Sequence, residues 1–151
     1  MGWLAALAAT FLLACNSATT HSEPREATQA ASAPHAARAI IDIETRAPRL
    51  SPVELARLRR EHPSVMTFDV RSEAEYSVSH LAGAVHVEPS SDQRHFVDRY
   101  RLLAPRTHFV FYCSTSARAQ VFADGVFLDL VEAGAESVTY LAGGIIAWSN
   151  A

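Results

Sequence analysis

From residue 51 onward, short apolar runs alternate with amphipathic stretches, and this alternation predicts most of the elements of the chain. The runs are rich in β-branched and aromatic residues, as expected of strands buried on both faces. In the stretches between them, apolar residues recur every three or four positions, as in helices that cover a sheet. The alternation favours an α/β domain with a mostly parallel sheet. The expected strands are Val65–Val70, the end of Leu81–Val87, Thr107–Tyr112 and Val138–Leu141, with a short extra strand at Ile40–Glu44.

Local signals set the expected ends of the helices. Ser51–Glu54 and Ser72–Glu75 each place a serine three residues before a glutamate, which is the capping-box pattern of a helix start. Pro52 suits the first helical position. The other expected helices are one capped by Ser90 or Ser91, bearing Phe96, Tyr100 and Leu103 and ended by Pro105; one over Ala117–Val131, ended by Gly134; and a short one after Gly143–Gly144 that carries Trp148.

The first part of the sequence differs from the rest. Residues 1–14 hold no charged side chain and are too short to span a bilayer as a stable helix, but they suit the apolar region of an export signal. Leu12–Leu13–Ala14–Cys15 resembles a bacterial lipobox, and this resemblance implies cleavage before Cys15 and its lipidation. The alternative is an ordinary buried helix with an incidental cysteine.

Residues 16–39 contain no large apolar side chain, so they cannot bury enough surface to offset the entropy of ordering. We therefore expect a signal peptide over 1–14, a lipid-anchored tether over 15–39 and a folded domain over 40–151. The lipobox resemblance implies an extracytoplasmic protein held on a bacterial membrane, on the periplasmic side or at the cell surface.

Composition and cysteine count narrow the possible chemistry. The 151 residues are 49% hydrophobic and carry a formal charge of −3, a weakly acidic balance that gives no basis for binding nucleic acid. If Cys15 is lipidated, Cys113 is the single thiol left among two cysteines, which excludes an internal disulfide. One available cysteine and widely spaced histidines also predict no metal site.

Cys113 follows a predicted buried strand and begins the loop Cys113–Ser114–Thr115–Ser116, before a long helix that starts near Arg118. Such a loop can point successive backbone N–H groups inward as an anion-binding nest, and the positive end of the helix favours a thiolate there. We therefore predict that Cys113 is a nucleophile. The alternative is a small buried core residue, a common role for an unpaired cysteine.

Four segments in order, over about Arg49–Trp148, resemble a rhodanese-like domain. Asp69–Val70–Arg71 is similar to the D-x-R signature of that family, and Cys113 through Arg118 is similar to its active-site loop. The other two segments are Glu75–Tyr76 followed by His80–Leu81–Ala82–Gly83–Ala84, and Leu141–Ala142–Gly143–Gly144–Ile145–Ile146–Ala147–Trp148, which matches a G-G-x-x-x-W ending.

The resemblance implies a three-layer α/β/α fold around about five strands, and a sulfurtransferase without a cofactor. Cys113 would take sulfur from a small anionic donor such as thiosulfate and pass it to a thiol or to cyanide. The implied binding residues are Ser114, Thr115, Ser116, Ala117 and Arg118, with Arg118 adding charge for the donor. Asp69 and Arg71 are expected to pair near the loop base in a structural role.

Two other functions stay open from the sequence. Ser114 stands where many active members have arginine, and Ser116 where many have glycine, so a non-catalytic interaction module is one alternative. A phosphate- or arsenate-handling enzyme is the other. The loop length argues against it, because Cys113 and Arg118 enclose four residues, whereas the related phosphatases have one more.

Overall fold

The computed structural model describes residues 45–151. The predicted signal peptide over 1–14, the lipidation site at Cys15, the rest of the tether over 15–39 and the strand at Ile40–Glu44 lie outside these residues. Among the described residues, none of the helices is both long enough and apolar enough to span a membrane.

The described residues form a sheet of five parallel strands in the order β1-β5-β4-β2-β3. β4 is central and fully buried, and β2 and β5 flank it in a register that pairs Phe68 with Phe111 and Phe111 with Tyr140. The sequence-based prediction of a mostly parallel sheet is confirmed. The strands are β1 (Arg49–Leu50), β2 (Val65–Asp69), β3 (Val85–His86), β4 (His108–Tyr112) and β5 (Ser137–Leu141).

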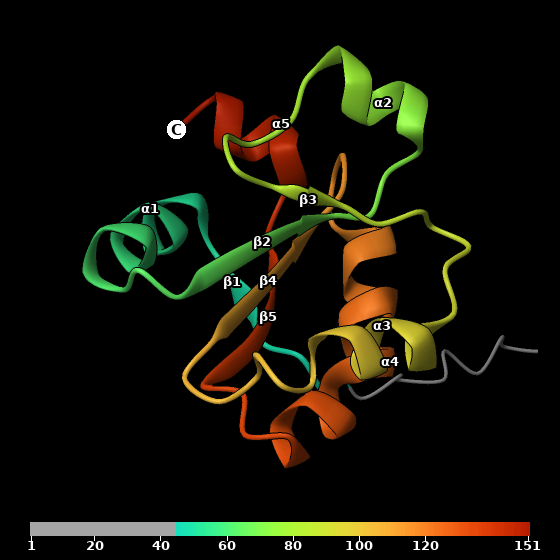
Figure 1. The fold of residues 1–151 in the computed structure, drawn as a ribbon. Coiled ribbons are helices and arrows are strands. Elements are labelled where there is room, and N and C mark those ends of the chain that lie inside the picture. Colours follow the sequence, from blue (N-terminus) through green and yellow to red (C-terminus); the bar gives the residue numbers. More distant parts are fainter. Residues whose placement is uncertain (1–44) are drawn as a thin grey trace, which may run out of the picture. The chain divides into compact units, whose positions relative to one another are not determined.

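Helices cover both faces of the sheet (Figure 1). The helices α3 and α4 pack on one face, whereas α1 and α5 pack on the other, so the domain has three layers. The remaining helix, α2, follows the carboxyl end of β2. The helices are α1 (Pro52–Glu61), α2 (Glu73–Val78), α3 (Gln93–Tyr100), α4 (Ala117–Glu132) and α5 (Gly144–Ser149).

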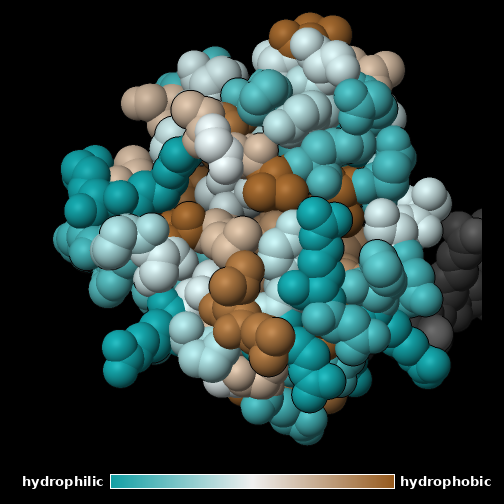
Figure 2. Space-filling view, viewed as in Figure 1, coloured by the Kyte–Doolittle hydropathy of each residue, from teal (hydrophilic) through white to brown (hydrophobic). Residues whose placement is uncertain are grey.

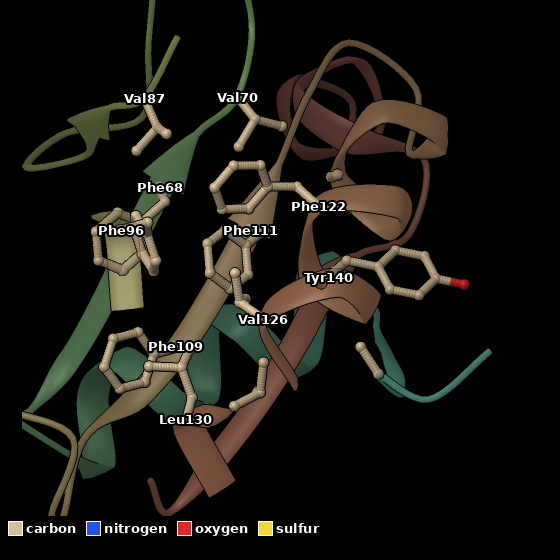
Figure 3. Packing of buried hydrophobic residues seen from close by; sticks show 14 of the residues in the cluster. Phe68, Val70, Val87, Phe96, Phe109, Phe111, Phe122, Val126, Leu130 and Tyr140 are labelled. Carbon is tan, nitrogen blue, oxygen red and sulfur yellow. The ribbon is translucent and has the colours of Figure 1, made fainter. Parts of the chain in front are cut away.

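The main core lies between the sheet and the α3–α4 layer, and aromatic rings dominate it (Figure 3). Phe68 is at its centre and contacts four other rings, which belong to Phe96, Tyr100, Phe109 and Phe111, with centroids 5.0–5.8 Å away. Each ring buries a large apolar area, so this cluster supplies much of the driving force for folding.

Some hydrophobic residues also reach the surface. Figure 2 shows them in several places among hydrophilic residues on one face of the molecule. Among these exposed residues is Val121, on the first turns of α4, which is 69% exposed. Isolated exposed apolar side chains are normal, so such a residue indicates a binding site only when other apolar residues lie beside it.

Both predicted capping boxes are present. The hydroxyl of Ser51 accepts from the Glu54 N–H, and the hydroxyl of Ser72 accepts from the Glu75 N–H, while each glutamate accepts from the N–H of its serine. These bonds satisfy donors that a helix start otherwise leaves free. They also fix the place where α2 begins, and therefore the position of Glu75.

The prediction for α3 was wrong at both ends. Asp92, rather than Ser90 or Ser91, is the N-cap, because its carboxylate accepts from the Arg94 N–H at 2.9 Å. The helix ends at Tyr100 instead of at Pro105, because the chain then continues in tight turns that bury Ala104 and leave Leu103 54% exposed. The sequence also did not predict β1, whose two residues are too few for a periodic pattern.

Candidate active site

Cys113 follows the last residue of β4 and continues its alternation of faces. Tyr112 packs with the α1–α5 layer, whereas Cys113 packs with the α3–α4 layer, in the same cluster as Val70 and Phe122. Cys113 is 1% exposed. The thiol therefore lies below the surface at the carboxyl end of the central strand, which is where ligands bind in open parallel sheets.

One backbone amide of the loop faces the sulfur. The Ser116 N–H donates to Sγ of Cys113, with 3.3 Å between nitrogen and sulfur. Ser116 adopts φ 142° and ψ −37°, a region that residues other than glycine rarely enter. Its hydroxyl accepts from the Gly143 N–H at 2.8 Å, a contact that helps to hold this conformation. Because α4 begins at the next residue, both the amide and the helix N-terminus favour negative charge on the sulfur.

The start of α5 holds the loop from the opposite side. The Ile145 N–H donates to the backbone oxygen of Cys113 at 2.9 Å, and the Ile146 N–H donates to that of Ser114 at 3.3 Å. Gly144 is buried against the same two peptide groups. These contacts orient two loop carbonyl oxygens toward α5 and leave no room for a side chain at Gly144, the first residue of that helix.

Glu75, from α2, binds the two polar side chains at the ends of the loop. Its carboxylate accepts from both terminal nitrogens of Arg118 at 2.8 Å and from the Ser114 hydroxyl at 2.8 Å. The Arg118 guanidinium, followed by the Ser114 hydroxyl, holds the pKa of Glu75 well below its usual range, and Glu75 in turn raises the pKa of Arg118. The loop cation predicted for an anionic donor is therefore already paired with a carboxylate.

This pairing predicts a pH-dependent stability. Because the pKa of Glu75 is lower in the folded protein than its ordinary 4.5, its stabilising contribution is complete above that value and is lost as the pH falls below it. Glu75→Gln should lower the free energy of unfolding at pH 7, and its difference from wild type should shrink in urea titrations toward pH 3. The exposed Glu61→Gln is the control, and a constant difference for Glu75→Gln would contradict the account.

Asp69 and Arg71 form a buried ion pair at and just after the end of β2. Asp69 is fully buried and accepts from the backbone N–H of Arg71 and from two of its guanidinium nitrogens, at 2.7–3.1 Å. The guanidinium also donates to the backbone oxygen of Ser79, and this bond ties the end of β2 to the end of α2. The pair therefore holds the helix that carries Glu75.

Asp69→Asn should destabilise the domain by about 3 kcal/mol, because it leaves the buried Arg71 cation without its counter-charge. Asp98→Asn on the exposed side of α3 should change the free energy of unfolding by less than about 0.5 kcal/mol. Urea denaturation measures both values, and similar effects for the two variants would show that the buried pair does not stabilise the fold.

Of the predicted set, Cys113, Ser114, Ser116 and Arg118 are linked by contacts around one loop, and Thr115, Ala117 and Arg118 are exposed. Ala117 and Arg118 also line a hollow beside the loop. Glu75 was missed as a member of the site, although it lies in a segment that carries the family resemblance. The signal that could have identified it was the Ser72–Glu75 capping box, which holds its carboxylate at the start of that segment.

Two hollows flank the loop. One has a volume of about 330 Å³ and is lined by Val70, Pro89, Gln93, Ala117, Arg118, Val121 and Phe122. The other, about 520 Å³, lies on the α5 side and includes Arg71, Ser114 and Trp148. Val70 and Phe122, which Figure 3 shows next to one another, belong to the same buried cluster as Cys113 on the α3–α4 side of the sheet, so the first hollow is on the thiol's side of the loop.

A separate set of polar residues lies beside the site. Glu73, His86 and Glu88 place one ligand-type atom each within 4.8 Å of one another. Nδ1 of His86 is 2.9 Å from the Glu73 carboxylate, and Nε2 is 2.8 Å from the backbone oxygen of Arg71. Both ring nitrogens of His86 therefore have a partner within the protein, and these contacts account for the arrangement.

Residues 51–151 match the family model of the rhodanese-like domain. The chain belongs to the rhodanese-like family. The match covers all ten elements except β1, including β4, the Cys113 loop and α5. The predicted family resemblance is thus confirmed.

Solved structures support the fold. Thiosulfate sulfurtransferase from Pseudomonas aeruginosa matches 70% of this chain at 24% identity and a TM-score of 0.54, over 18% of its own length. A rhodanese-like domain from Anabaena matches 68% at 26% identity and a TM-score of 0.50, over 74% of its length. An As–Sb reductase from Leishmania major matches 69% at 19% identity and a TM-score of 0.57, over 77% of its length. The rhodanese-like α/β fold is therefore shared by proteins named for different reactions.

Proposed function

We propose that this domain is a sulfurtransferase that carries a sulfane sulfur on Cys113. The thiolate attacks the outer sulfur of a thiosulfate-like anion, a new S–S bond forms, and the S–S bond of the donor breaks. For thiosulfate, sulfite leaves with the bonding electron pair. A thiol or cyanide then attacks the outer sulfur of the persulfide, and Cys113 regains its thiolate.

The contact between the Ser116 N–H and the sulfur of Cys113 carries this proposal. The N–H donor and the helix N-terminus both lie at the Cys113 sulfur. They stabilise the Cys113 thiolate, which attacks the donor at the start of the cycle and is released from the persulfide at its end. The four residues between Cys113 and Arg118 make a narrow loop. A loop of this size suits a single sulfur atom better than a tetrahedral phosphate or arsenate.

The route to the sulfur follows from its burial. With Cys113 only 1% exposed, a donor must displace neighbouring side chains to reach Sγ. Gln93 and Arg118 line the hollow on the thiol's side, and both have long side chains that can rotate on a nanosecond timescale. In the proposed cycle, these two side chains move aside when the donor enters.

One set of assays separates the candidate functions. The full chain is incubated with thiosulfate and cyanide, with an aryl phosphate, and with arsenate and a thiol reductant. Thiocyanate formation supports sulfur transfer. Phosphate release or arsenite formation would instead support the phosphate- or arsenate-handling alternative, to which the As–Sb reductase gives a likeness in fold. A folded chain without any of these activities would support the interaction module.

A further inference from the structure

The hollow on the thiol's side of the loop is mostly apolar. Five of its seven lining residues are Val70, Pro89, Ala117, Val121 and Phe122. We infer that it holds the apolar carbon group of an organic sulfane-sulfur donor, so that the site favours donors such as aryl thiosulfonates over inorganic thiosulfate. This inference rests on the proposed sulfur transfer and names its class of donor.

Charge in the site argues against a small dianion as the preferred donor. Arg118 lines the hollow, but both of its terminal nitrogens donate to Glu75. The other arginine of the site, Arg71, is bound by Asp69 in the same way. Thiosulfate carries two negative charges, and here it would meet two cations whose charges carboxylates already balance. A thiosulfonate carries one charge, so it requires less compensation.

The shape and lining of the hollow favour an apolar group. Its volume of about 330 Å³ is larger than a 150 Å³ apolar cavity that accepts benzene in another protein. Val70 and Phe122 form buried parts of the wall, whereas Val121 is 69% exposed at its rim. A bound aryl group would cover this exposed valine and remove apolar surface from water.

The chemical step is the same for both classes of donor. The Cys113 thiolate attacks the terminal sulfur of R–SO₂–S⁻, and an S–S bond forms at Cys113. The S–S bond of the donor breaks, and the sulfinate R–SO₂⁻ leaves with the electron pair. No oxidant or reductant is needed, and the group R remains in the hollow during attack, where it helps to align the donor.

The test compares thiosulfate, methanethiosulfonate and benzenethiosulfonate as donors to the full chain. Loading is quenched by alkylation and followed on the tryptic peptide 107–118, whose single cysteine is Cys113. Each rate is divided by the rate of the same donor with glutathione, and this division removes the donor's intrinsic reactivity. We call the normalised rate with benzenethiosulfonate, divided by that with methanethiosulfonate, the benzene-to-methane ratio. We expect this ratio to be about ten or more for Cys113, whereas a value of one would mean the same relative reactivity as glutathione.

Two variants link this preference to the hollow. Val121→Asn should lower the benzene-to-methane ratio by about threefold or more, whereas Leu128→Asn, an exposed residue of the same helix outside the hollow, should leave it unchanged. Glu75→Gln frees Arg118 from its carboxylate, so it should raise the rate with thiosulfate relative to benzenethiosulfonate.

The outcomes separate the two claims. Loading of Cys113 by all three donors in the same proportions as glutathione would overturn the inferred donor class and leave the proposed sulfur transfer standing. If Leu128→Asn lowers the benzene-to-methane ratio as much as Val121→Asn does, the inferred donor class is also overturned. Failure of every donor to load Cys113 in the folded chain would contradict the sulfur transfer itself.

Discussion

Gly144→Ala is expected to destabilise the domain by about 3 kcal/mol or more and to lower its melting temperature by at least about 10 °C. An added Cβ would lie 2.3 Å from the backbone oxygen of Cys113 and 2.5 Å from that of Ser114. Neither oxygen can move freely, because the N–H groups of Ile145 and Ile146 bind them. The strain would therefore fall on the Cys113 loop, and sulfur transfer should be lost together with stability.

Gly83→Ala is the matched control for that variant. Gly83 has φ +76° and Gly144 has φ +57°, so alanine meets a comparable backbone penalty at both positions, about 1 kcal/mol. At Gly83, however, nothing lies within 4 Å of the added Cβ. Thermal unfolding of the two variants isolates the steric contribution, and equal melting temperatures would show that α5 does not clamp the loop.

Cys113→Ser should reduce thiocyanate formation by on the order of 10³-fold or more while the chain stays folded. Serine is similar in size, but its hydroxyl is a far weaker nucleophile at neutral pH and forms no persulfide. The matched control is Cys15→Ser, which makes the same atom exchange at the other cysteine of the sequence and should leave turnover unchanged. Steady-state assays on the three proteins, with circular dichroism to check folding, measure the effect.

Much of the fold was predictable because its signals are local. The capping boxes at Ser51 and Ser72 and the apolar run before Cys113 each lie within a few consecutive residues, and the structure has the elements they predict. The failures have a physical reason as well. At the start of α3, two serines and an aspartate were all competent caps, and only the position of the helix against α4 decides between them.

The site was predictable in part. Cys113, Arg118 and the unusual place of Ser116 follow from one contiguous segment, and Ser116 does adopt a positive φ. The pairing of Arg118 with Glu75 joins residues 43 positions apart, and no local pattern reports it. The hollow likewise combines side chains from the segments after β2 and β3 with others from α3 and α4, so only the folded chain shows that these apolar residues meet beside the Cys113 loop.

The most direct test of sulfur transfer is the fate of a single sulfur atom on the full chain. After brief exposure to benzenethiosulfonate, removal of excess donor and alkylation, the account predicts one extra sulfur on the peptide 107–118, and its loss as thiocyanate when cyanide is added before alkylation. Absence of that sulfur from the peptide of the folded protein, or a sulfur that cyanide does not remove, would contradict it.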